Sequence, residues 1–143
     1  MTFRPYNLLQ SVNTSDQREN NTGATMTKAT PVRINTSGEI DFIDVSVEAN
    51  SIGAMGVTGV EILNGTFGDV VSSGKIVDIP TSASFGDTLW VSKTGGLTNI
   101  KPSIGVNGFV TGDLSILVGV VAKNELNPSL KDLYLTISIK GQL

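Results

Sequence analysis

Apolar and polar residues alternate at every second position over several stretches of the chain, a pattern that predicts β-strands. The segment 113–122 is apolar on both faces, so we expect it at the centre of a sheet. No segment has the periodicity of an amphipathic helix. The cleanest alternation lies in 132–140, with Leu133, Leu135, Ile137 and Ile139 on one face and Tyr134, Thr136 and Ser138 on the other.

Two further strands are expected over 32–35 and 39–48, joined as a hairpin by the turn residues between them. The apolar positions of the second strand change phase between Phe42 and Ile43. A one-residue slip in a period-two pattern predicts a β-bulge or a sharp bend at that point. The inward-facing set across the slip is Ile40, Phe42, Ile43, Val45 and Val47.

Shorter strands are expected over 60–63, 75–79 and 87–92, whereas 49–59 is rich in Gly and Ala and fits either a short helical turn or an irregular crossover. About six to nine short strands with frequent turns predict an all-β fold, a compact barrel or a sandwich. Three Gly-Asp pairs precede apolar runs and predict tight turns, because glycine tolerates positive φ and aspartate can accept hydrogen bonds from the turn backbone. These pairs are Gly68-Asp69, Gly86-Asp87 and Gly112-Asp113.

The first 30 residues are dominated by Asn, Thr, Ser and Gln and cannot bury enough apolar surface to fold alone. We therefore predict an extended N-terminal arm over 1–30 and a β body over 31–143. The arm either docks on a neighbouring subunit or partner, or folds back on its own body. Its expected anchors are Phe3, Pro5, Tyr6, Leu8 and Leu9.

The connection 93–112 is too apolar for a simple solvated loop. It either contacts another subunit or seals the end of its own body. Trp90 is expected on the polar face of its strand, opposite Leu89 and Val91, which suggests an interface anchor, with burial in an inverted orientation as the alternative. The residues expected at an oligomer interface are Trp90, Leu97, Ile100, Ile104 and Phe109.

The chain has no histidine and no cysteine, the residues that most often carry acid–base, nucleophilic and transition-metal chemistry. Carboxylates at Glu39, Asp41, Asp44 and Glu48 could serve as a catalytic pair or as calcium ligands, but such charges usually keep a surface soluble. We therefore expect no enzyme, no cofactor and no metal site. A net charge of −3 argues against nucleic-acid binding. No apolar run is long enough to span a bilayer, so we expect a soluble product, made in the cytoplasm, without membrane contacts.

From Gly65 to the end, the order of elements resembles small all-β virion proteins of tailed bacteriophages. In such proteins a Gly-Asp turn leads to a strand that ends in a Gly-Gly loop, followed by a Gly-Leu-Thr segment, a proline and a Val-Gly-Val-Val strand. The matching residues here are Gly86-Asp87, Gly95-Gly96-Leu97-Thr98, Pro102 and Val118-Gly119-Val120-Val121.

The resemblance implies a structural virion protein, either a capsid decoration or cement subunit or the base of a head fibre, commonly a homotrimer. The implied partners are further copies of the chain and the major capsid protein or other virion proteins. A tail or collar component is an alternative. A third class is host recognition through a receptor- or carbohydrate-binding surface, for which only Trp90, Tyr134 and Phe109 supply exposed aromatic candidates.

Overall fold

The computed structural model describes residues 13–143, and the all-β prediction is confirmed over them. The five predicted anchors of the arm lie outside the described residues. Within the described range the chain forms nine strands and one short 3₁₀-helix, η1 (Glu48–Asn50). The strands are β1 (Thr14–Glu19), β2 (Pro31–Ile34), β3 (Ile40–Phe42), β4 (Ala54–Thr58), β5 (Phe67–Ile76), β6 (Thr88–Val91), β7 (Leu97–Thr98), β8 (Leu114–Lys123) and β9 (Lys131–Gln142).

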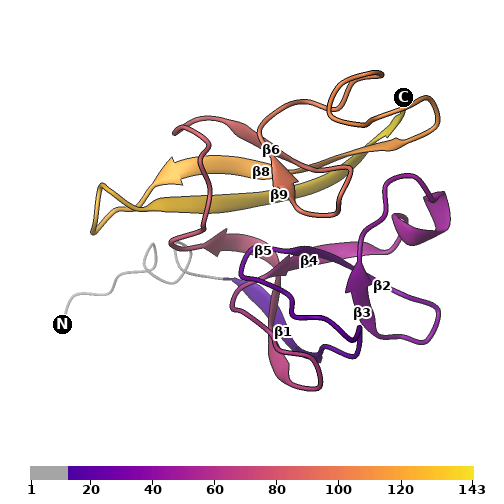
Figure 1. The fold of residues 1–143 in the computed structure, drawn as a ribbon. Coiled ribbons are helices and arrows are strands. Elements are labelled where there is room, and N and C mark those ends of the chain that lie inside the picture. Colours follow the sequence, from indigo (N-terminus) through magenta and orange to yellow (C-terminus); the bar gives the residue numbers. More distant parts are fainter. Residues whose placement is uncertain (1–12) are drawn as a thin grey trace.

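The strands form one antiparallel sheet that is not closed into a barrel. Its order is β3-β2-β4-β5-β9-β8-β6-β7, and β1 pairs with β5 beside this path. Figure 1 shows the two halves of the sheet as separate layers, with β1 to β4 in the lower one and β6, β8 and β9 in the upper one. We call them the lower and the upper half.

Strand β5 belongs to both halves. Along most of its length it pairs with β1 and β4, whereas its last residues, from Gly74 to Ile76, pair with β9. Gly74 has a φ of +103°, and a side chain there would overlap the Asn13 carboxamide. A glycine is therefore required where the sheet turns from the lower half into the upper half.

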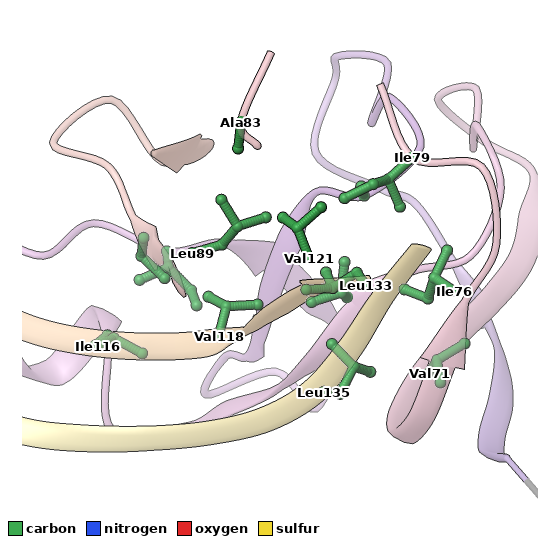
Figure 2. Packing of buried hydrophobic residues seen from close by; sticks show 14 of the residues in the cluster. Val71, Ile76, Ile79, Ala83, Leu89, Ile116, Val118, Val121, Leu133 and Leu135 are labelled. Atoms are coloured by element: carbon green, nitrogen blue, oxygen red, sulfur yellow. The ribbon is translucent and has the colours of Figure 1, made fainter. Parts of the chain in front are cut away.

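The larger core lies between the two halves and takes side chains from both. From the lower half come Val57 and Val71, and from the upper half come Leu89, Val118 and Leu133. Figure 2 shows part of this cluster, where side chains of β5, β6, β8 and β9 meet. Burial of these aliphatic groups is the main term that holds the halves together.

A second, smaller core covers the opposite face of the lower half. Its buried members are Met26, Val32, Ile40, Ile62 and Val70. Neighbouring residues of β5 thus serve different cores, because Val70 faces the smaller cluster and Val71 the larger one. This is the alternation expected of a strand buried on both faces.

The phase slip after Phe42 marks a change of core. Ile40 is buried in the smaller core and Phe42 packs against it, whereas Ile43 and Val45 are buried in the larger one. Strand β3 ends at Phe42, so the slip marks the end of a strand that is shorter than expected. Val47 was expected to face inward, but it is exposed beside η1, where the chain has already left the sheet.

The structure places residues 13–30 in the body, so the boundary predicted at Thr30 is not seen. Strand β1 pairs with β5 over six residues. Met26 is fully buried and forms a bridge with Ile62, and the Asn20 side chain donates hydrogen bonds to the carbonyls of Ala24 and Ile62. A polar sequence therefore joins the body through backbone pairing and a buried carboxamide, neither of which depends on apolar periodicity.

Strand β4 lies where 49–59 suggested a helical turn or an irregular crossover, and only η1 answers to that expectation. Gly56 is one of the glycines that made this segment look unlike a strand. A Cβ at Gly56 would overlap the Val71 carbonyl across the sheet. Its role is close approach of two strands rather than a loop. The strand expected over 60–63 is reduced to the single bridge at Ile62, with Val60 and Leu63 exposed on either side.

Two of the three Gly-Asp pairs form turns as predicted. Gly86 and Gly112 have φ values of +86° and +94°. Gly68 instead lies within β5, where a Cβ would be 2.5 Å from Cγ1 of Ile62. The prediction for Gly68-Asp69 was wrong because the glycine accommodates a packed side chain of the smaller core.

Gly119→Ala is expected to lower the free energy of unfolding by about 1–3 kcal/mol, the usual penalty for overpacking. A Cβ at Gly119 would overlap the Tyr134 carbonyl and crowd the Leu133 side chain. The first is paired backbone and the second is packed in the larger core, so neither can move aside without loss of other contacts. Gly96→Ala is the matched control, since its Cβ would meet nothing closer than 3.7 Å. Equal denaturation midpoints for the two variants would contradict the close approach of β8 and β9.

Candidate functional site

The upper half presents one face to the core and the other away from it. Directly paired residues share a face, so the register places Thr88, Val120, Tyr134 and Lys75 in one row across β6, β8, β9 and β5. A second row holds Thr98, Trp90, Leu117 and Ser138 across β7, β6, β8 and β9. We call these eight residues, with the exposed Thr136 of β9, the outer face.

Strand β6 sets the orientation of Trp90. Leu89 and Val91 are fully buried in the larger core, whereas Thr88 and Trp90 are half-buried on the other side. The predicted alternation is therefore confirmed, and the inverted orientation is excluded. The Trp90 side chain lies on the outer face, where a large aromatic ring contributes little to the larger core.

A bulge in β8 places two aliphatic side chains on the outer face. Leu117 and Val120 are three positions apart, so a regular strand would direct them to opposite faces. Against β6 the register shift gives β8 one extra residue between Leu117 and Gly119, whereas against β9 the same segment of β8 is one residue short. Leu117 and Val120 then both face outward. Val118 between them is buried in the larger core.

The aromatic side chain of Tyr134 is 44 % exposed and its neighbour Val120 is 39 % exposed. The Lys75 ammonium lies 5.9 Å from the centre of the Tyr134 ring, within the range of a cation–π contact. Hydroxyl groups of four Thr and Ser residues surround these side chains. The outer face therefore combines two aromatic rings and two aliphatic groups with a polar rim, which is the usual anatomy of a protein interface.

The other predicted interface residues do not gather into one patch. Ile100 and Ile104 are exposed on the long connection, and Leu97 is half-buried against the larger core. Phe109 was expected at an interface but is only 2 % exposed, because it packs into the larger core of its own chain. Phe109 is therefore neither an interface residue nor an exposed aromatic.

An ion pair closes the ends of the long connection. The Lys93 ammonium lies 2.6 Å from Oδ2 of Asp113, which also accepts a hydrogen bond from the Val110 amide. The Asp113 side chain is almost completely buried. Burial alone would raise the pKa of Asp113, but the hydrogen bonds from Lys93 and Val110 and the Lys93 charge outweigh it and keep that pKa below its ordinary value. The connection is thus fastened to its own body.

Three of the four acidic residues considered for catalysis or calcium binding, Glu39, Asp41 and Asp44, have structural partners. Asp41 pairs with Arg33 at 3.1 Å, and Asp44 accepts hydrogen bonds from the hydroxyl and amide of Ser46, which lower its pKa. Glu39 binds the Asn21 carboxamide. Within 13–143, no three acidic side chains come close enough together to hold a metal ion.

Sequence reasoning placed Trp90 and Tyr134 on the solvent-facing side of their strands, but it expected Leu117 and Val120 to be buried. A run that is apolar on both faces is typical of a central buried strand, and β8 is indeed flanked on both sides. Burial of both faces does not follow, since nothing in the described chain fully covers the outer one. The signal that could have revealed this is Gly119, which allows the bulge and the close contact with β9.

No helix within 13–143 has the length and apolar character needed to cross a membrane. No protein-family model and no curated protein matches the chain.

Asp113→Asn is expected to lower the free energy of unfolding at pH 7 by about 2 kcal/mol, because a charged hydrogen bond to Lys93 is lost. The pKa of Asp113 is lower in the folded chain, so its carboxylate stabilises the fold above the unfolded value, near about 4. That contribution is lost as the pH falls through the folded value. The difference between wild type and variant should therefore shrink from pH 7 to pH 3 in denaturation experiments. If the two free energies of unfolding differed by the same amount at pH 7 and pH 3, the stabilising role of the ionised Asp113 carboxylate would be contradicted.

Proposed function

We propose that the chain is a structural virion protein of a tailed bacteriophage that stabilises the particle as a decoration or cement subunit or a head-fibre base. The observation that supports this proposal best is the outer face. Trp90, Leu117, Val120 and Tyr134 lie together on a rigid sheet and are only partly covered by their own chain. The resemblance of the segments after Gly65 to phage virion proteins gives the class of particle.

Such a face couples the association of subunits to the stability of the particle. Each aromatic side chain can bury roughly 150–250 Å² when a partner covers it. This burial occurs only in the assembled state, so association adds its free energy to the stability of the particle. The scarcity of charged residues, 16 % of the chain, favours such protein contacts over a repelling surface.

The partners proposed are further copies of the chain, arranged as a homotrimer, and the major capsid protein or another virion protein. A cyclic homotrimer joins different surfaces of neighbouring subunits. The outer face is proposed as one of these surfaces. The segment 1–12, with Phe3, Tyr6, Leu8 and Leu9 as anchors, is proposed to clasp a neighbour.

Host recognition is a second candidate, as part of a tail or collar component. It is favoured by the presence of Trp90 and Tyr134 on one face among hydroxyl groups, since sugars stack on aromatic rings and bind hydroxyls. Isothermal titration calorimetry of the purified protein with a panel of oligosaccharides separates the two candidates. Saturable binding that is lost in Trp90→Ala would favour recognition over assembly.

Trp90→Ala is expected to weaken self-association by roughly 2 kcal/mol, about thirtyfold in Kd, as for an interface hot spot. The measurement is the mass distribution on dilution by analytical ultracentrifugation. Phe67→Ala is the matched control, because Phe67 is also an exposed aromatic but lies in the lower half. An unchanged Kd for Trp90→Ala, or a monomer at every concentration of wild type, would contradict the proposed role of the outer face.

Deletion of residues 1–12 is expected to preserve the fold but to abolish incorporation into particles. The described members of both cores lie within 13–143, and the shortened chain keeps all of them. Deletion of residues 1–30 is the contrasting variant, since it also removes β1 and the buried Met26 and should unfold the protein. Particles that carry the 1–12 deletion at normal copy number would refute the clasp.

A further inference from the structure

The hairpin between β8 and β9 ends in the loop 124–130, which Figure 1 shows projecting at one end of the upper half. At its tip the side chain of Leu126 is 95 % exposed. Single exposed aliphatic side chains are common on protein surfaces, but none of the exposed large hydrophobic residues within 13–143 is more exposed than Leu126, so a partner that covers it gains the most apolar burial there.

The loop is held by its own polar groups. The carboxamide oxygen of Asn124 accepts hydrogen bonds from the amides of Leu126 and Asn127, both at 2.9 Å. The corresponding oxygen of Asn127 accepts from the Ser129 amide and hydroxyl, and the Leu130 amide donates to the Asn127 carbonyl. These hydrogen bonds fix the turn without the Leu126 side chain.

The base of the loop is anchored in the protein. Asp132 is almost completely buried, and its carboxylate accepts hydrogen bonds from the Asn124 carboxamide at 3.1 and 3.2 Å. The Asp78 amide, on the connection after β5, donates to the same carboxylate at 3.0 Å. The tip is therefore ordered before any partner binds, which lowers the entropic cost of docking.

A cavity of about 230 Å³ opens at the edge of the outer face. Its apolar lining is Val77, which is exposed, with the edges of Val71 and Ile76, which are otherwise buried in the larger core, and its rim carries one cation, Lys75, and one anion, Asp69. Lys75 is also the end of the first row of the outer face. The cavity thus adjoins, through Lys75, the surface proposed above for self-association.

We propose that Leu126 of one subunit inserts into this cavity on a second copy of the chain. The leucine would cover the apolar wall, and the adjacent Glu125 is opposite in charge to Lys75 on the rim. Lys123, at the end of β8, is likewise opposite in charge to Asp69. This inference rests on the proposed self-association and identifies one contact within it.

The contact joins two different parts of the molecule, since the tip belongs to the upper half and most of the cavity wall to β5. Each subunit can therefore donate a tip to one neighbour and receive a tip from another. Such a heterologous contact closes into a ring when the rotation between subunits permits. A homotrimer satisfies this requirement.

Cysteine cross-linking tests the contact, because the chain has no cysteine of its own. The double variant Leu126→Cys/Val77→Cys should form disulfides between subunits under mild oxidation and yield covalent species larger than a dimer. Leu126→Cys alone can give at most a dimer. The matched control is Leu126→Cys/Val47→Cys, since Val47 and Val77 are similarly exposed, 41 % and 46 %. Cross-linking no greater than in this control would overturn the proposal.

A dilution series measures the same contact in the absence of cysteine. Leu126→Asp should raise the Kd of self-association at least tenfold, whereas Leu126→Met should stay within about threefold of wild type, because methionine fills the same volume. Circular dichroism confirms that both variants are folded. If Leu126→Asp associates like wild type while Trp90→Ala does not, this inference fails and the proposed function stands. If wild type is a monomer at every concentration, both fail.

Discussion

The pairing of β5 with strands of both halves is the constraint on which the rest of the structure depends. Its first part satisfies the backbone groups of β1 and β4, and its last three residues satisfy those of β9. Val70 and Val71 then serve the smaller and the larger core from opposite faces. Because Gly74 lets the strand turn without strain, one segment holds two layers at the spacing that the larger core requires. The orientation of the upper half, and with it of the outer face, follows from this single strand.

Once the upper half is fixed, the distribution of its apolar groups is decided by one local irregularity. A regular β8 would bury one set of aliphatic side chains and expose another with no relation to Trp90. The bulge at Val118 and Gly119 instead places Leu117 opposite Trp90 and Val120 beside Tyr134. The close contact of Gly119 with β9 stabilises that geometry. An interface-like surface is thus produced by backbone pairing rather than by side chains that rearrange.

The sequence predicts best those elements whose faces differ in polarity. The strands β6 and β9 and the hairpin of β2 and β3 were expected from alternation, and the buried positions of Leu89, Val91, Leu133 and Leu135 follow from it. The prediction of strands and burial failed at residues whose structural role is a contact with a residue distant in sequence. Gly56 and Gly68 were interpreted as loop signals, although each makes room for a neighbour across the sheet. Phe109 was assigned to an interface, with sealing of its own body by the long connection as the alternative, and the structure agrees with that alternative for this residue. No local pattern in the sequence distinguishes the two.

The separation between fold and outer face bears directly on function. The larger core is closed by Leu89, Val91, Val118 and Leu133, which point away from Trp90 and Tyr134. The exposed groups therefore add little to the stability of the isolated chain, and their burial remains available to association. In a chain of 143 residues the fraction of surface that can be buried internally is limited, so this uncovered apolar surface is the physical basis of the proposed stabilisation by partners. Loss of an outer-face side chain should consequently change assembly while the denaturation midpoint stays nearly constant. Changed assembly with an unchanged denaturation midpoint distinguishes an interface side chain from a core side chain that is only partly covered.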